Sequence, residues 1–201
     1  MNAQSFWNVI GLYNKNTIII QIIFIILIAF SAILSYTHKC TYLIKIALGV
    51  TDLFIGIIFF GYYGTEPIQK YFALPLYICC GVLFLYEAWS NKKDQLKKPN
   101  HFQIVLLILY CLYPLISYLL GNSFPEMVTY IMPCPIVSIS IAIYAGYARK
   151  NKLLLALLTL WGLTGIKSII FNAYEDIILL ICGIYGVYLL INEHKRKKQY
   201  N

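Results

Sequence analysis

Seven long runs of apolar residues occupy most of this 201-residue chain. They cover residues 17–36, 42–62, 72–90, 102–120, 133–148, 153–171 and 177–192. A helix needs roughly 20 mainly apolar residues to cross the hydrocarbon core of a bilayer. The runs are continuous and lack the alternation of apolar and polar residues that barrel strands show. The sequence therefore predicts one all-α transmembrane domain over residues 1–201 with seven membrane-spanning helices.

The composition excludes the classes that could compete with this interpretation. Hydrophobic residues make up 60% of the chain and charged residues 12%, with a mean hydropathy of +0.72. A water-soluble domain has about a quarter of its residues charged. The loops between the runs are too short to form a soluble domain. Any function is therefore expected within the membrane or at its edge.

The basic residues predict how the chain is oriented. Of the 16 lysines and arginines, 12 lie in the loops after the first, third and fifth runs and at the C-terminus. Cytoplasmic loops carry an excess of these residues. The prediction is an N-terminus outside and a C-terminus in the cytoplasm of an inner (plasma) membrane protein. The net charge of +8 is then a topology signal, so the expected partner is the lipid bilayer and not nucleic acid.

The segment 2–13 before the first run is only mildly polar. Its residues Phe6, Trp7, Ile10 and Tyr13 have the spacing of one helix face. Aromatic residues of this kind lie at the level of the lipid headgroups. We expect a short interfacial helix on the outer surface.

Four ionisable residues fall inside the predicted spans, where each is a candidate functional group. Asp52 lies near the midplane and is expected either to hold a proton, cation or substrate, or to be buried, neutral and hydrogen-bonded. Lys167 lies near the outer end of its span and could reach the outer interface or extend toward Asp52. Lys45 and Glu87 lie at similar depth near the cytoplasmic side. They could form a structural pair, Glu87 could reach the interface instead, or Glu87 could serve transport.

Six cysteines raise a second possibility. Cys79 and Cys80 are adjacent, and Cys134 stands between Pro133 and Pro135. Free cysteine usually packs as a small apolar residue, but thiols also exchange disulfides or bind soft metals. Cys79, Cys80 and Cys134 are thus weak candidates for a metal site. The chain has no C-x-x-C and no recognisable catalytic signature, so we expect neither an enzyme nor a cofactor.

Two parts of the sequence suggest an internal repeat. At an offset of 109 residues, Gly56-Ile57 corresponds to Gly165-Ile166 and Glu66 to Glu175. Parallel repeats of three spans joined by one linking span give a 3+1+3 arrangement. Such a repeat would place a site between the two halves, and a chance match between apolar helices is the alternative.

Several short strings resemble an uncharacterised family of prokaryotic multi-pass inner-membrane proteins, the domain of unknown function 6064. They are Tyr13-Asn14 with Gln21, Tyr113-Pro114, Leu119-Leu120-Gly121, Phe124-Pro125, Pro133-Cys134-Pro135, and then Trp161, Gly165 and Asp176. The chain departs from the family pattern at Ile18 and Ile19, where tryptophan and proline are expected. The resemblance implies a membrane class and a topology, and it implies no reaction.

Three functions follow from these observations. The first is the binding or transport of a small solute in a midplane cavity, lined by Asp52, Lys167, Gln21, Asn14 and Glu87, with residues 121–135 as an outer lid. The second is a thiol-based redox or soft-metal-handling membrane protein. The third is a non-catalytic assembly subunit. Solute identity and oligomeric state, a homo-oligomer included, stay open.

Overall fold

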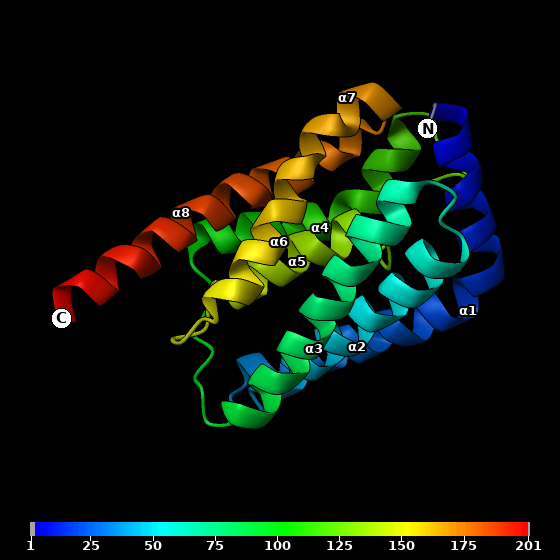
Figure 1. Ribbon diagram of the computed structural model, residues 1–201. Coiled ribbons are helices and arrows are strands. Elements are labelled where there is room, and N and C mark those ends of the chain that lie inside the picture. Colours follow the sequence, from blue (N-terminus) through cyan, green and yellow to red (C-terminus); the bar gives the residue numbers. More distant parts are fainter. Residues whose placement is uncertain (1–2, 201) are drawn as a thin grey trace.

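The computed structural model describes residues 3–200, without the side chains of Ala3, Ile169, Phe171 and residues 196–200. Helices dominate this part of the chain (Figure 1). Within it there is no strand, and only two isolated bridges join single residues. The predicted all-helical fold is confirmed.

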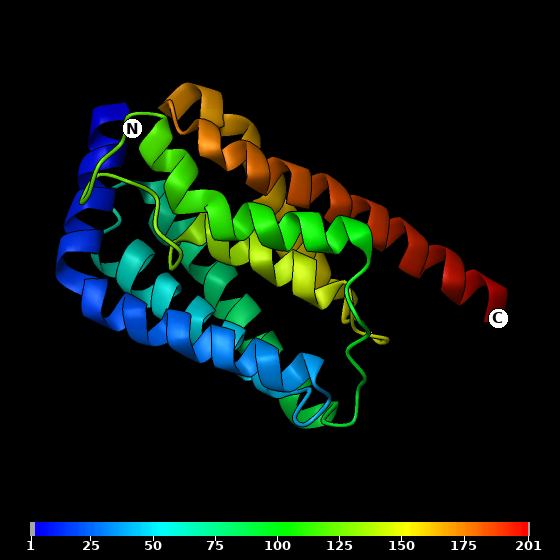
Figure 2. The ribbon, with the colours of Figure 1, turned by 180° about the vertical axis from the view of Figure 1, so that it is seen from behind.

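The first helix is longer than expected. α1 (Ala3–Tyr36) includes both the predicted segment 2–13, whose residue 2 lies outside the described residues, and the first span. The helix bends along its length (Figures 1 and 2). The Thr17 hydroxyl donates to the Tyr13 carbonyl at 2.7 Å, a type of bond that often bends helices. The expected separate segment is therefore the N-terminal arm of α1.

The remaining helices follow the other six apolar runs. They are α2 (Leu43–Phe54) with η1 (Ile55–Tyr62), η2 (Gln69–Ala73) with α3 (Leu74–Ser90), α4 (His101–Leu119), α5 (Pro133–Tyr144), α6 (Lys152–Leu163) with η3 (Thr164–Lys167) and α7 (Ser168–Phe171), and η4 (Tyr174–Asp176) with α8 (Ile177–Tyr200). The side chains of Asn100 and Asn151 cap the starts of α4 and α6, as asparagine does at helix N-termini.

Five of the seven helical segments are long and apolar enough to cross a membrane. They are Gln4–Tyr36, Leu43–Tyr62, Gln69–Ser90, His101–Leu119 and Tyr174–Lys195. α5 stops at Tyr144 because the chain then turns and Tyr147 pairs with Leu96. α6 stops at Leu163, and a 3₁₀ turn begins at Thr164. By length, the described chain thus offers five spans where the sequence predicted seven.

The short helix α5 forms the centre of the bundle. Eleven of its 12 residues are buried, so other elements surround it. α2 packs closely on α3, and α6 on α8. In the second pair a Cβ at Gly162 would lie 2.6 Å from the Gly183 Cα. Such contacts let membrane helices approach closely.

The outer surface of α1 is strongly apolar. Ile19, Ile23, Ile26, Phe30 and Ile33 are each 59–74% exposed. A soluble monomer rarely exposes a continuous apolar patch of this kind. The surface is therefore compatible with a membrane protein.

Different segments of the chain gather at the two ends of the bundle (Figure 2). At one end, here called the lysine end, the loops 37–42, 91–100 and 145–151 meet. The Thr41 hydroxyl donates to the Asp94 carbonyl there at 2.7 Å, and the Ala148 amide donates to the Gln95 carbonyl at 3.3 Å. At the other end, the lid end, lie the N-terminus, α7 and residues 121–135, which we call the lid.

Candidate functional site

A cavity of about 170 Å³ lies at the lid end of the bundle. Its walls come from the N-terminal arm of α1, from η1 and η2, from the lid, and from the segment between α6 and α8. Most of the lining is apolar and aromatic, with Phe6, Phe59, Phe60, Phe72 and Met132 among its members. A dry apolar cavity of this order can hold a molecule as large as benzene.

A buried carboxylate forms the polar part of the cavity wall. Asp176 is 8% exposed, and its Oδ1 accepts a hydrogen bond from the Tyr113 hydroxyl at 2.9 Å. The Cys134 thiol is a second hydrogen-bond partner of this carboxylate. Asp176 and Cys134 both line the cavity. The helices α4 and α5 and the 3₁₀ turn η4 thus meet at one acidic point on a mostly apolar wall.

Trp161 supplies the neighbouring donor. Its ring makes edge-on contacts with Phe60 and Tyr77, with centroids 5.3 and 5.2 Å away. Its indole nitrogen is buried and has the Cys134 sulfur as a neighbour, although no contact of this nitrogen within residues 3–200 has the geometry of a full hydrogen bond. A thiol sulfur is a weak hydrogen-bond acceptor. An oxygen or nitrogen acceptor on a bound molecule would therefore be a better partner for this N–H.

The mouth of the cavity carries a positive charge. Lys167 lines the cavity and is exposed, beside the exposed side chains of Ile68 and Phe72. The sequence placed Lys167 in a polar site together with Asp52. The structure brings it instead to the cavity that contains Asp176.

Asn14 and Gln21 hold the lid in place. The Asn14 side-chain amide donates to the carbonyls of Pro125 and Met127, both at 2.8 Å. The Thr129 hydroxyl donates to the Gln21 Oε1 at 2.8 Å, and the Gln21 amide donates to Thr17 and Asn14 at 2.9 and 3.1 Å. Both residues are fully buried. Their polar atoms bind the chain itself and do not line the cavity.

Asp52 is fully buried in α2, and neither carboxylate oxygen has a hydrogen-bond partner in the described chain. Tyr77 and Cys80 of α3 are among its neighbours. Asp52 is not among the residues that line the lid-end cavity, which contains Lys167 and Asp176.

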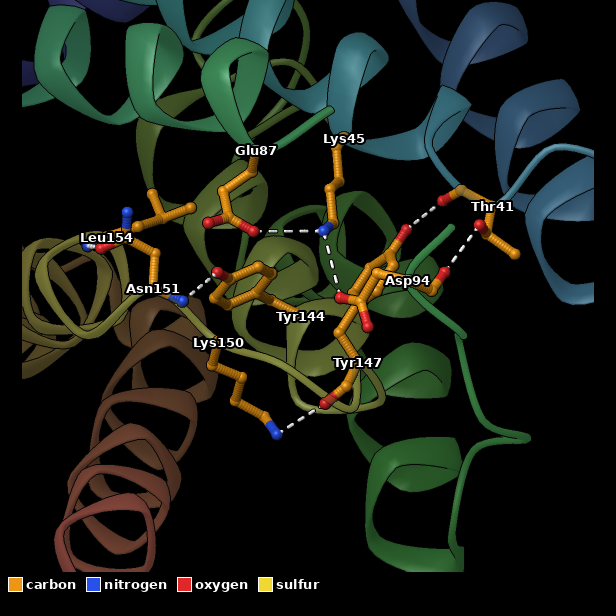
Figure 3. A network of polar contacts seen from close by, with 9 residues as sticks. All are labelled: Thr41, Lys45, Glu87, Asp94, Tyr144, Tyr147, Lys150, Asn151 and Leu154. Atoms are coloured by element: carbon orange, nitrogen blue, oxygen red, sulfur yellow. Dashed lines mark hydrogen bonds and ion pairs between the residues drawn. The ribbon is translucent and has the colours of Figure 1, made fainter. Parts of the chain in front are cut away.

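Glu87 lies at the lysine end in a buried ion cluster (Figure 3). The Lys45 Nζ is 3.3 Å from the Glu87 Oε2 and 3.4 Å from the Asp94 Oδ2. The same nitrogen lies 4.1 Å from the centre of the Tyr147 ring. The Tyr147 hydroxyl donates to the Thr41 carbonyl. The structural pair of Lys45 with Glu87, one of the alternatives left open by the sequence, is present.

The cysteines are dispersed, and all six are free. Cys79 is exposed and its neighbour Cys80 is buried, so the two thiols do not share an environment. No group of three or more His, Cys, Asp or Glu side chains within residues 3–200 is arranged to hold a metal ion. Of the three candidate cysteines, only Cys134 lines the lid-end cavity.

Sequence reasoning missed Asp176 and Trp161 as cavity residues. Both appear in the family resemblance, but pattern alone does not show that they converge with Cys134. One signal was available: Glu175 and Asp176 stand directly before the last apolar run, where two adjacent acids are costly to bury. Their position therefore predicts that both carboxylates have hydrogen-bond partners.

A family model matches residues 3–201 of the chain, and its description is "Family of unknown function (DUF6064)". The chain belongs to this family, as the resemblance predicted. No curated protein and no solved structure matches it.

Proposed function

We propose that this member of the DUF6064 family is a multi-pass membrane protein that binds a small, mainly apolar solute in the lid-end cavity. The observation that carries the proposal is the cavity itself. It combines aromatic and aliphatic walls with one buried carboxylate and one buried indole N–H, beside which lies only a weak acceptor, the Cys134 sulfur. Ligand sites are typically apolar cavities with a few polar groups that fix orientation.

The membrane placement is supported by the five long apolar helices and by the exposed apolar surface of α1. The loops that carry most lysines gather at one end of the bundle. Under the positive-inside rule that end is cytoplasmic. The lid and the cavity then face the outside of an inner (plasma) membrane, and the C-terminus lies in the cytoplasm.

The groups on the wall define the solute. Asp176 accepts hydrogen bonds, so the solute carries a donor such as a hydroxyl or an ammonium group. Trp161 donates, so an acceptor atom lies near that donor. The size of the cavity restricts the buried part of the solute to about one ring or a short aliphatic chain. A hydroxyl satisfies both protein groups, because it donates and accepts.

Transport would require a second site, which we place at Asp52. A buried carboxylate in a spanning helix without a protein partner is the group that a proton or a cation would satisfy. Its separation from the cavity supports a role in coupling and not in solute contact. Asn14, Gln21 and Glu87 are occupied by protein partners, and we assign them to positioning the lid and the lysine end.

A thiol-based function is the second candidate, and one observation favours it. Cys134 lies on the cavity wall and is bonded to Asp176. A redox role would use this single thiol in exchange with a disulfide of the substrate, in which the Cys134 sulfur forms a mixed disulfide and the second substrate sulfur leaves as a thiolate. It predicts that Cys134→Ser abolishes the function, whereas solute binding predicts that this change has a minor effect.

The test of solute binding is thermal stabilisation of the purified full chain in a neutral detergent. Indole, benzyl alcohol and benzylamine serve as probes of graded polarity. We expect benzyl alcohol or benzylamine to raise the melting temperature, and Asp176→Asn to remove most of this effect. Glu175→Gln is the matched control, since Glu175 is the adjacent buried acid and does not line the cavity. Equal responses of both variants, or no stabilisation of the unmodified chain by any probe, would reject the proposal.

A further inference from the structure

A second cavity, of about 440 Å³, lies at the lysine end of the molecule. It forms where the loop after α1 meets the loop after α3. Its walls include His38 and Lys39 from the first loop and Lys92 and Lys93 from the second. The bond from the Thr41 hydroxyl to the Asp94 carbonyl holds the two loops together. Cationic side chains from separate parts of the chain therefore surround one space.

The positive charge of this cavity is not cancelled by its own walls. Asp94 is the one carboxylate in the lining, and its Oδ2 lies 3.4 Å from the Lys45 Nζ. Lys39, Lys92 and Lys93 make no ion pair within residues 3–200. An anion that enters the cavity would meet three ammonium groups that no described carboxylate neutralises.

The first of the two loops is rigidly built. His38 has a left-handed backbone with φ of 59°. The amides of Lys39 and Cys40 both donate to the Leu34 carbonyl, at 3.1 and 3.3 Å. The Ser35 hydroxyl donates to the Cys40 carbonyl at 3.0 Å. These bonds fix the backbone of one wall, so little conformational entropy is lost when an anion binds.

A tryptophan indicates the depth of the cavity in a bilayer. Trp89 is 77% exposed near the end of α3, and the Lys92 Nζ lies 4.5 Å from the centre of its ring. Exposed tryptophan in membrane proteins concentrates at the level of the lipid headgroups. In the membrane placement proposed above, on which this step rests, the cavity lies where lipid phosphates are found.

We propose that the lysine-end cavity binds a phosphate group, presented by the headgroup of an anionic phospholipid. Lysine binds phosphate as a point charge, and three lysines around one space suit the single negative charge of a phosphodiester. Anionic lipids of the cytoplasmic leaflet attract basic residues near the surface. The site is separate from the lid-end cavity and does not depend on which solute binds there.

The experiment compares two double variants of the full chain in neutral detergent. Lys92→Gln with Lys93→Gln removes two lysines from the cavity wall. Lys97→Gln with Lys98→Gln is the matched control, because it removes the same charge from exposed lysines of the same loop that do not line the cavity. Each protein is titrated with phosphatidylglycerol, with phosphatidylcholine and with inorganic phosphate, and the melting temperature is followed.

We expect phosphatidylglycerol to stabilise the unmodified chain and the control variant at similar concentrations. The Lys92/Lys93 variant should need about 30-fold more lipid for half of the effect. Each lysine near an anionic surface raises the affinity about five- to six-fold, and the variant lacks two of them. Phosphatidylcholine should have little effect. Equal losses in the two variants would show a general electrostatic attraction and overturn the proposal, as would the absence of stabilisation by phosphatidylglycerol.

The titration with inorganic phosphate shows whether the bound phosphate group belongs to a lipid headgroup or to a soluble compound. If it reproduces the stabilisation with the same dependence on Lys92 and Lys93, a soluble phosphate compound is the ligand and the lipid assignment is overturned. Asp176→Asn should leave lipid binding intact. Failure of the lid-end proposal is thereby separated from failure of this one.

Discussion

The two ends of the bundle both bury charge, but they bury it in different ways. At the lysine end, Lys45 lies within 3.4 Å of two carboxylates and against an aromatic ring, with almost no exposed surface. At the lid end, Asp176 faces a cavity, and within residues 3–200 the nearby Trp161 N–H has only the weakly accepting Cys134 sulfur beside it. A cluster whose groups bind one another serves structure. Groups that converge on a space are free to bind something else.

This comparison predicts its largest effect at Lys45. Lys45→Met leaves Glu87 and Asp94 buried without a cation, and breaking a buried ion cluster in this way costs about 3–5 kcal/mol. We expect a large fall in the melting temperature of the detergent-purified protein. Adding Glu87→Gln and Asp94→Asn to the same chain should restore most of the loss, because no uncompensated charge is then left. A small effect of Lys45→Met alone would contradict the structural role.

A moderate effect is expected where the lid is attached. Asn14→Ala removes the donors to the Pro125 and Met127 carbonyls and should cost about 1–3 kcal/mol of stability. Hydrogen exchange of the lid amides should accelerate in this variant. The adjacent exposed residue provides the control, and Lys15→Ala should change the stability by no more than about 0.5 kcal/mol. Unchanged exchange in the lid would show that these bonds do not hold it.

A smaller effect of opposite sign is expected at Asp52. Its carboxylate has no hydrogen-bond partner within residues 3–200, so Asp52→Asn removes a buried ionisable group without breaking a bond. The free energy of unfolding should stay the same or rise by about 1 kcal/mol, in line with the cost of burying an unpaired polar group. A loss of several kcal/mol would instead show that a bound cation or another partner stabilises this site.

The smallest effect on stability belongs to Trp161. Trp161→Phe removes an N–H whose neighbour is the weakly accepting Cys134 sulfur and keeps most of the ring contacts with Phe60 and Tyr77. The stability should change by less than about 1 kcal/mol, while binding of benzyl alcohol weakens several-fold. A variant that binds this alcohol as well as the unmodified chain would remove Trp161 from the site.

The helical segments could be predicted because apolar runs of spanning length leave the chain few alternatives. The Lys45–Glu87 pair could be predicted for a similar reason, since both residues lie about one turn from the same end of adjacent helices. The early end of α5 could not be predicted from the sequence, because it depends on the tertiary pairing of Tyr147 with Leu96. The predicted 3+1+3 repeat and the membrane orientation stay predictions.

The site was harder to predict than the fold. Asn14 and Gln21 are polar residues in an apolar helix, and the sequence alone favoured a role in solute binding. Their partners are atoms of the lid, mainly backbone carbonyls, and no side-chain pattern reveals where these lie. Asp176 joins the site only because α4 and α5 converge on the η4 turn that carries it. Sequence patterns identify polar residues that are costly to bury in an apolar helix. The tertiary structure decides whether these residues bind other parts of the chain or a bound molecule.

The most direct test of the account is the labelling of single cysteines with a membrane-impermeant maleimide in intact cells. In a chain whose native cysteines are replaced by alanine, Lys167→Cys lies at the mouth of the lid-end cavity, and Lys97→Cys lies at the lysine end. We predict that Lys167→Cys is labelled from outside and is protected by a bound solute, and that Lys97→Cys is labelled only after the cells are permeabilised. Labelling of both positions from the same side, or from outside at Lys97→Cys alone, would contradict it.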